Sequence, residues 1–172
     1  SMACFVDDGN SQIILFLIVS MLPVFIGGLG EDTGYDISPL VRLMLSFASA
    51  LLAGLLLSQW LSRIGIPGID LIVSTSVTAA IVTMLVSGGF SHAFNLIDGL
   101  NGLSLGVASM MAAGLCAVAY MMGDPLVATL SMILMASCLG LYVLNFPFGK
   151  LFLGDAGAYS IGHILMWLAV LL

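Results

Sequence analysis

The sequence predicts an all-α fold, a polytopic integral membrane protein with about six transmembrane helices. Two observations carry this prediction. Hydrophobic residues fill 61% of the 172 positions, with a mean hydropathy of +1.23, and charged residues fill only 7%. An ordinary soluble domain has about 25% charged residues, so a soluble fold is excluded. The net charge of −6, with three Lys and Arg in all, also argues against nucleic-acid binding, which needs clustered basic side chains.

Six apolar stretches have the length that a transmembrane helix requires. A helix that crosses a hydrocarbon core of about 30 Å needs roughly 20 consecutive, mostly apolar residues. We expect the whole chain, residues 1–172, to form a single transmembrane domain. Its predicted spans cover residues 11–30, 39–61, 71–88, 103–122, 126–144 and 158–172.

Turn and capping residues separate these spans. Ser38 before Pro39, and Asp124 before Pro125, each put a capping side chain ahead of a proline at the first helical position. This pairing is typical of a helix start. The segment before Asp70 is too rich in glycine and proline for a helix, and Asp70 is predicted to cap the third span.

The chain between the third and fourth spans needs a break. Apolar residues continue on both sides of Asp98, so one long helix would hold this carboxylate in hydrocarbon. That would cost ~2.5–3.5 kcal/mol on insertion scales, and Gly99 and Gly102 would weaken the helix further. We therefore predict that residues 89–102 form a loop at a membrane surface.

The order of the spans predicts where the polar loops lie. Because successive spans alternate in direction, the first, third and fifth loops should share one membrane face. These three loops carry three polar clusters, Glu31/Asp32/Asp36, Asn95/Asp98/Asn101 and Asn145/Lys150/Asp155. Arg42 and Lys150 accompany this face against Arg63 on the other, so the positive-inside rule assigns it to the cytoplasm.

Asp98 and Asp155 differ from ordinary capping carboxylates because glycines flank both. Glycine lets the backbone turn sharply and approach a ligand closely. Asn95 and Asn101 lie three residues to either side of Asp98 and would share its face if that stretch were helical. Since Mg²⁺ takes one or two carboxylates together with water and substrate phosphates, the clusters predict a magnesium and phosphate site.

Three further side chains have two interpretations each. Lys150 could contact a phosphate as a point charge, or it could reach the membrane interface as a snorkelling lysine. His92, three residues before Asn95, could help to bind a substrate or be structural. His163, inside the last span, could be a ligand or a proton carrier, but with no acidic partner near it in the sequence it is expected to be structural.

Two longer motifs carry a family resemblance. Residues 95–104 (NLIDGLNGLS) and 145–159 (NFPFGKLFLGDAGAY) resemble the two long signatures of the polyprenyl-phosphate N-acetylhexosamine-1-phosphate transferases. Residues 30–33 (GEDT) resemble the acidic-pair motif of that family, and residues 37–43 (ISPLVRL) resemble the segment that follows it. The motifs occur in the order and spacing of the family, so the resemblance is specific.

The resemblance implies an enzyme. Members of this family move a sugar-1-phosphate from a nucleotide diphosphosugar to a lipid phosphate, with Mg²⁺, and release the nucleoside monophosphate. For this chain it implies UDP-N-acetylhexosamine and a polyprenyl phosphate as substrates, UMP as product, and Mg²⁺ or alternatively Mn²⁺ as cofactor. It also implies a multi-pass protein of a bacterial inner membrane, active at the cytoplasmic face in cell-envelope or O-antigen polysaccharide synthesis, with a homodimer as one assembly.

The resemblance also implies roles for individual residues. By position, Asp155 is the magnesium ligand. Asp32 forms with Glu31 the acidic pair near the lipid phosphate, and Asp32 is a candidate base. Asp98 serves the nucleotide and diphosphate side. The residues expected to support substrate binding are Asn95, Asn101, Lys150 and His92.

The sequence departs from the family pattern at three positions. Glu31 stands where the acidic pair commonly has Asp, Asn101 where a second Asp is often found, and His92 where Asn is expected. The chain also corresponds to only the middle of a family protein, without its first spans and its later loop rich in His and Arg. An isolated chain without activity is one expectation that follows.

Two other classes of function stay open at this point. A cation-binding transporter or channel would also hold acidic side chains, although at mid-membrane rather than in loops at one face. A non-catalytic membrane fragment or scaffold is the second alternative, kept open by the short length and by His92.

Overall fold

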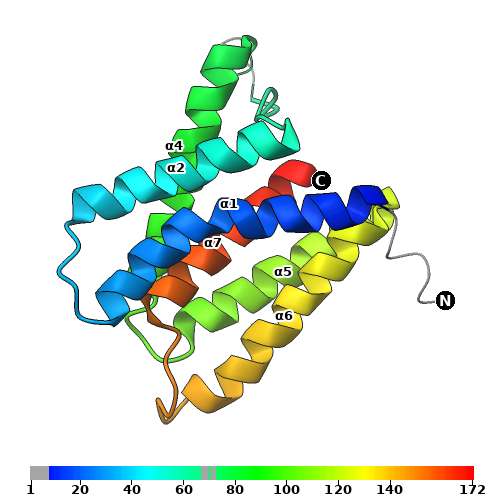
Figure 1. Cartoon of the computed structure of the whole chain (residues 1–172). Coiled ribbons are helices and arrows are strands. Elements are labelled where there is room, and N and C mark those ends of the chain that lie inside the picture. The colour runs from blue at the N-terminus through cyan, green and yellow to red at the C-terminus, as the bar shows by residue number, and fades with distance from the viewer. Residues whose placement is uncertain (1–7, 67–69, 71–72) are drawn as a thin grey trace.

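The computed structural model describes residues 8–66, 70 and 73–172. Over these residues the chain forms six helices and no strand, arranged as in Figure 1: α1 (Asp8–Asp32), α2 (Pro39–Leu57), α4 (Ser76–Ile97), α5 (Leu103–Met122), α6 (Pro125–Asn145) and α7 (Gly154–Leu171). The five helices other than α7 are long and apolar enough to cross a membrane. The predicted all-α, polytopic membrane fold is therefore confirmed.

Two predicted helix starts are also confirmed. Ser38 Oγ accepts a hydrogen bond from the Val41 N–H (3.4 Å) at the start of α2. Asp124 Oδ1 accepts one from the Val127 N–H (3.0 Å) at the start of α6. In both helices a proline takes the first position, where its missing N–H removes no intrahelical hydrogen bond.

The predicted cap at Asp70 is wrong. Asp70 Oδ1 instead accepts hydrogen bonds from the N–H groups of Ile64 (2.8 Å) and Gly65 (3.1 Å), so the carboxylate closes the loop that precedes it. α4 begins later along the chain and is capped by Thr75. Residues 71 and 72, where the third span was predicted to start, lie outside the described residues.

Several predicted helix ends are displaced. The structure ends α1 at Asp32, α2 at Leu57 and α4 at Ile97, and starts α7 at Gly154, in place of the predicted 30, 61, 88 and 158. Ser58 ends α2 early because its backbone is left-handed, with φ of 53°. No proline interrupts residues 89–97, so α4 continues to the glycine-rich segment that follows. The polar residues near these ends therefore lie on terminal helical turns rather than in loops.

α7 occupies the centre of the bundle. It contacts all five other described helices, most extensively α1 and α4, and α5 and α6 form a hairpin beside it (Figure 1). Because helices rather than lipid cover its faces, α7 can hold polar side chains. His163 and Trp167 are 1% and 0% exposed, and Ser20 Oγ of α1 lies 3.1 Å from His163 Nε2.

Two glycines allow α7 to approach its neighbours at backbone distance. A Cβ at Gly28 of α1 would lie 2.5 Å from the Cα and backbone N of Ala156. A Cβ at Gly162 of α7 would lie 2.8 Å from Ser91 Cα in α4. These distances are well inside van der Waals contact, so any side chain at either position would push two helices apart. The contacts thus fix where α7 begins relative to α1 and α4.

The polar loops meet at one end of the bundle. α1, α4 and α6 end there, and α2, α5 and α7 begin there (Figure 1). Hydrogen bonds join the helix ends and their connections to one another, for example from Asn95 to Asp155 and from Gly102 to Asn145. The structure confirms that the three polar clusters lie at one end of the bundle, and the assignment of that end to the cytoplasm stays a prediction.

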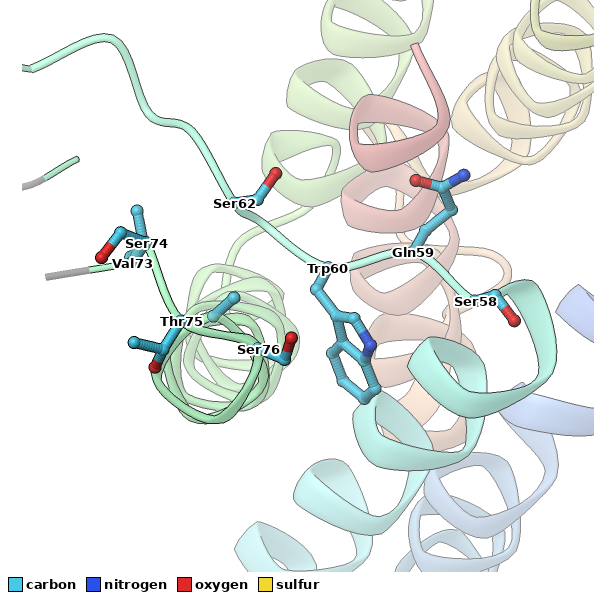
Figure 2. Close-up of a pocket in the computed structure, with 9 residues that line it drawn as sticks. Ser58, Gln59, Trp60, Ser62, Val73, Ser74, Thr75 and Ser76 are labelled. Carbon is cyan, nitrogen blue, oxygen red and sulfur yellow. The ribbon is translucent and has the colours of Figure 1, made fainter. Parts of the chain in front are cut away.

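The opposite end of the bundle carries a separate polar pocket. Its volume is about 230 Å³, and it lies where α2 ends and α4 begins (Figure 2). Hydroxyl groups of Ser58, Ser62 and Thr75 line it beside Trp60, whose ring packs against Gly54. The described residues that line this pocket include no carboxylate, so it is distinct from the acidic clusters.

Candidate functional site

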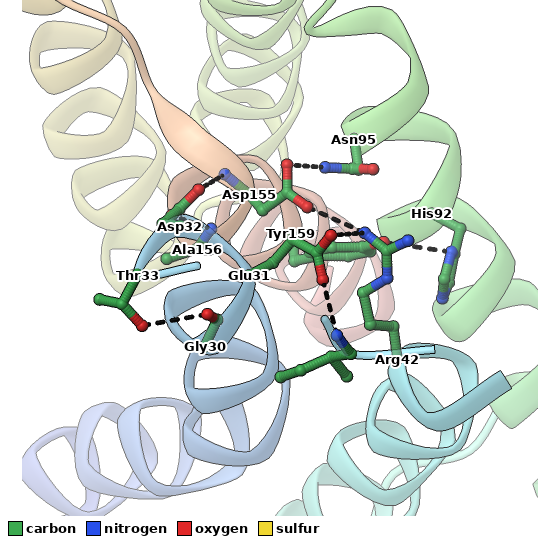
Figure 3. A network of polar contacts seen from close by, with 11 residues as sticks. Gly30, Glu31, Asp32, Thr33, Arg42, His92, Asn95, Asp155, Ala156 and Tyr159 are labelled. Atoms are coloured by element: carbon green, nitrogen blue, oxygen red, sulfur yellow. Dashed lines mark hydrogen bonds and ion pairs between the residues drawn. The ribbon is translucent and has the colours of Figure 1, made fainter. Parts of the chain in front are cut away.

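Asp32 caps α7 from another helix. Asp32 Oδ1 accepts a hydrogen bond from the Asp155 N–H (2.8 Å), and Asp32 Oδ2 accepts one from the Ala156 N–H (3.0 Å), as Figure 3 shows. Leu153, which precedes the helix, gives no side-chain cap of its own. Gly154 lies directly against Asp32, since a Cβ there would be 2.7 Å from Asp32 Oδ2. The carboxylate of Asp32 thus compensates the unpaired N–H groups and the positive end of the α7 dipole.

Asp155 is the centre of the polar network. Its Oδ1 accepts a hydrogen bond from Asn95 Nδ2 (2.9 Å), and its Oδ2 accepts one from Arg42 Nη1 (3.0 Å). Arg42 Nη1 also lies 3.9 Å from Glu31 Oε1, while Glu31 Oε2 accepts a hydrogen bond from the Ile37 N–H (3.2 Å). Arg42 of α2 and Asn95 of α4 therefore both contact the Asp155 carboxylate of α7, and Glu31 of α1 lies beside Arg42 (Figure 3).

His92 lies behind this network rather than in the open. Its ring meets the ring of Tyr159 edge to face, with centroids 5.0 Å apart. The Tyr159 hydroxyl is 3.4 Å from His92 Nδ1, and Tyr159 is only 2% exposed. Figure 3 shows the pair next to Arg42. A role for His92 in substrate binding stays a prediction, and the geometry gives it a supporting position beneath Arg42.

Asp98 lies just beyond the end of α4, where it is half-buried. Burial raises the pKa of this carboxyl group above its ordinary value, the hydrogen bond from the Ser104 hydroxyl lowers it, and the negative charges of Asp155 and Asp32 raise it again. The three carboxylates therefore interact through space. Carboxylates outnumber the one arginine among them, so this end of the bundle has an excess of negative charge.

The raised pKa of Asp98 predicts a dependence of stability on pH. Because the pKa is higher in the folded than in the unfolded chain, ionised Asp98 destabilises the fold, and this loss grows as pH rises from 3.8 through the folded pKa. Asp98→Asn keeps an acceptor for Ser104 and removes the charge. We expect thermal unfolding in detergent to show a higher Tm than wild type at pH 7 and a difference that shrinks toward pH 3.8.

The control for this prediction is Asp36→Asn. Asp36 is exposed in the loop after α1 and forms no side-chain hydrogen bond or ion pair with the described residues. Its variant should leave Tm almost unchanged at both pH values. A Tm for Asp98→Asn below that of wild type at pH 7 would contradict the destabilising charge at Asp98.

Asn145 connects the two longest sequence motifs. It is 5% exposed at the end of α6, accepts a hydrogen bond from the Gly102 N–H (2.5 Å) and donates one to the Leu151 carbonyl (2.8 Å). Asn101 adds a second link by donating from Nδ2 to the Pro147 carbonyl (3.3 Å).

A common face of Asn95, Asp98 and Asn101 was expected only if this stretch were helical. α4 ends before Asp98, and Asn101 bonds to the later loop instead.

Two polar residues of the predicted clusters stay outside the network. Lys150 and Asp36 are exposed, and neither side chain forms a hydrogen bond or ion pair with the part of the chain that the structure describes. The Lys150 N–H donates to the Leu144 carbonyl (3.1 Å), which holds its loop against the end of α6. Both interpretations of the Lys150 side chain therefore stay open.

The donor set fits a hard cation that brings its own water. Within the described ranges, no group of three His, Cys, Asp or Glu side chains is close enough to enclose a metal ion. Mg²⁺ commonly binds through one or two carboxylates and completes its shell with water and phosphate oxygens. The excess of carboxylates at this end, with Asp98, Asp155 and Asp32 close enough to influence one another, suits that mode of binding.

Sequence analysis did not assign three of the structural contacts. Arg42 was counted for topology and within the segment 37–43, Asn145 within a polar cluster and a motif, and Tyr159 within a motif, and none was given a contact or a role. A signal existed for Arg42, because a charged residue just inside an apolar span commonly has a specific partner. Tyr159 follows Asp155 by four residues, which is the helical spacing that puts two side chains on one face.

Comparison with known proteins identifies the family. Residues 14–172 match the family described as glycosyl transferase family 4. The chain belongs to glycosyl transferase family 4. This family member is 31% identical over 109 residues to a phospho-N-acetylmuramoyl-pentapeptide-transferase of Staphylococcus carnosus. It is 36% identical over 90 residues to a probable undecaprenyl-phosphate N-acetylglucosaminyl 1-phosphate transferase of Bacillus subtilis, and 33% identical over 110 residues to a decaprenyl-phosphate N-acetylglucosaminephosphotransferase of Mycolicibacterium smegmatis.

These matches cover the chain more fully than they cover the relatives. They include 63%, 52% and 59% of this family member but only 34%, 25% and 27% of the three relatives, in the same order. The chain thus spans about a third or less of the length of the relatives it matches. Family membership confirms the resemblance carried by the motifs and does not favour a cation transporter.

Proposed function

We propose that this protein transfers an N-acetylhexosamine-1-phosphate from a UDP-sugar to a polyprenyl phosphate and releases UMP. The observation that carries the proposal is the meeting of Asp32, Asp98 and Asp155 at one end of a membrane bundle that belongs to glycosyl transferase family 4. Two of the relatives are named for undecaprenyl or decaprenyl phosphate together with an N-acetylglucosamine phosphate. Negatively charged phosphates would be repelled by these carboxylates, so their binding here calls for a cation between phosphate and carboxylate.

We propose Mg²⁺ as that cation, with Mn²⁺ as a substitute. Asp155 would hold it directly, and Asp98 would act on its water shell, because Asp155 is central and Asp98 is engaged by Ser104. When bound, the ion neutralises the diphosphate of the sugar nucleotide and stabilises charge during an in-line displacement. Asn95 keeps the Asp155 carboxylate oriented by donating to Oδ1.

Besides capping α7, Asp32 would act as the base that takes a proton from the lipid phosphate. Each of its oxygens accepts one N–H group and keeps a further lone pair. One of these lone pairs could take the proton of the lipid phosphate, so Asp32 remains the candidate base, with Glu31 as its acidic partner. Asp32 would then be oriented for this step by the first turn of α7. Lys150, exposed on the neighbouring loop, is free to contact a phosphate oxygen.

We further propose that the polar end faces the cytoplasm across a bacterial inner membrane. The support is the balance of Arg42 and Lys150 at this end against Arg63 at the other. A UDP-sugar would arrive from water, and the phosphate of the lipid would lie at the membrane interface, where the helix ends carry the site. A homodimer stays a prediction from the resemblance.

Transfer from radiolabelled UDP-N-acetylglucosamine to undecaprenyl phosphate tests the proposal. Membranes that contain the protein carrying this sequence are expected to form labelled lipid and UMP when Mg²⁺ or Mn²⁺ is present. EDTA should abolish the transfer and added Mg²⁺ should restore it, and membranes without the protein should show none. If no UDP-N-acetylhexosamine gave labelled lipid, the reaction would be wrong; if transfer survived EDTA, the cofactor would be wrong.

A further inference from the structure

Arg42 is paired with the Asp155 carboxylate, which the proposed cation would need as a ligand. It lies in the first turn of α2, with its side chain 19% exposed, and its Nη1 is 3.0 Å from Asp155 Oδ2. Its Nε is buried and has no hydrogen-bond partner among the described residues. Among the described residues, the contact to Asp155 is therefore the one hydrogen bond of this guanidinium group.

A divalent cation and this guanidinium group compete for Asp155. Mg²⁺ binds a carboxylate oxygen at about 2.1 Å, so an ion on Oδ2 would put two positive charges within a few ångströms of Arg42. Repulsion between such close charges is strong in a half-buried site. Asn95 is neutral and donates to the other oxygen, so it can keep its contact when the ion binds. Arg42 cannot.

Glu31 gives Arg42 a second position. Its Oε1 is already 3.9 Å from Arg42 Nη1, and its other oxygen is fixed by the Ile37 N–H. A modest movement of the guanidinium group away from Asp155 would complete this ion pair, and the long Glu side chain has the reach for it. The exchange keeps the charge of Arg42 compensated when Asp155 turns to a cation.

We propose that Arg42 is a positioning residue that pairs with Asp155 when no cation is bound and moves to Glu31 when a divalent cation binds. This inference rests on the proposed function, because it takes Asp155 as the cation ligand. Arg42 would thereby set the affinity of the site for the cation and keep three nearby carboxylates from repelling one another in its absence.

The affinity for Mn²⁺ tests this exchange without any measurement of transfer. Mn²⁺ alone is titrated into the 172-residue chain in neutral detergent, and free Mn²⁺ is read by electron paramagnetic resonance. Arg42→Gln is expected to bind Mn²⁺ about tenfold more tightly than wild type, since one nearby opposing charge shifts an ionic equilibrium by about one to three powers of ten. Arg63→Gln removes the same charge at the opposite end of the bundle and should stay within about twofold of wild type.

Asp155→Asn separates a failure of this inference from a failure of the proposed function. It should weaken Mn²⁺ binding by at least about tenfold. If it does so while Arg42→Gln binds as Arg63→Gln does, the exchange is wrong and the metal site stands. If Asp155→Asn binds Mn²⁺ as wild type does, the cation site of the proposed function is itself wrong.

A measurement on the wild-type chain covers the case in which Arg42→Gln does not fold. The chain has only two arginines, Arg42 and Arg63, so side-chain Nε–H signals of ¹⁵N-arginine protein are easily assigned with the Arg63→Gln variant. Titration with Mg²⁺ is expected to shift the Arg42 signal and leave that of Arg63 unchanged. Saturation with Mg²⁺ that leaves both signals in place would overturn the proposal.

Discussion

Asp155→Asn is expected to reduce sugar-phosphate transfer by at least ~100-fold, because loss of even an outer-shell contact to a metal ligand commonly costs 10–100-fold. The substitution removes the charge that a divalent cation requires and keeps the size of the side chain. Among the described residues, it also leaves Glu31, at 3.9 Å, as the one acidic partner of Arg42. Transfer is measured with radiolabelled UDP-N-acetylhexosamine and undecaprenyl phosphate at saturating Mg²⁺.

A measurement of stability shows whether transfer is lost because the metal ligand is missing or because the protein unfolds. Asp155 and Arg42 side chains are 28% and 19% exposed, so breaking their pair should cost about 1–2 kcal/mol, less than the 3–5 kcal/mol of a fully buried pair. Asp36→Asn makes the same change of charge on an exposed side chain at the same end and should keep full transfer. Retention of most of the wild-type rate by Asp155→Asn would exclude this carboxylate as the metal ligand.

Much of the fold follows from composition and capping chemistry. Ser38 and Asp124 cap helices where their pairing with proline predicts a helix start. Asp70 fails as a cap because the same carboxylate can bond to the N–H groups of its own loop, and a sequence does not show which N–H groups will be near. The end of α4 was missed because the cost of burying Asp98 requires a break before this residue but does not say where, and the helix continues as far as Ile97.

The candidate site, like the fold, could be predicted from the sequence only in part. The alternating direction of the spans predicts that Asp32, Asp98 and Asp155 lie at one end of the bundle, since the end at which a residue lies depends only on the number of spans before it. The pairs within the site depend on which helices are lateral neighbours, and the sequence does not specify this. α7 is central, so Asp155 meets Asn95 of α4 and Arg42 of α2 at once. That central position also explains how α7 can hold the buried His163 and the half-buried Asp155 among apolar helices.

Gly28→Ala is expected to destabilise the protein by roughly 3 kcal/mol, the upper part of the range for overpacking, and to impair transfer. An added Cβ would lie 2.5 Å from backbone atoms of Ala156 and 2.6 Å from the carbonyl carbon of Asp155. Backbone atoms cannot rotate away as side chains do, so α1 and α7 must separate. Asp32 is one helical turn beyond Gly28, on the same face of α1, so its bonds to the first turn of α7 should lengthen with the separation.

The matched control is Gly114→Ala in α5, where an added Cβ meets no atom within 4 Å. It should be neutral or slightly stabilising, because Ala is favoured over Gly in a helix by about 1 kcal/mol. Thermal unfolding in detergent compares the two variants, and transfer is assayed well below the lower Tm. A displacement of about 1 Å at a reacting group can cost about 100-fold in rate, so Gly28→Ala should lose activity even where it is folded. If Gly28→Ala matched Gly114→Ala in both Tm and transfer, the close contact of α1 with α7 would not be what holds Asp32 at the start of α7.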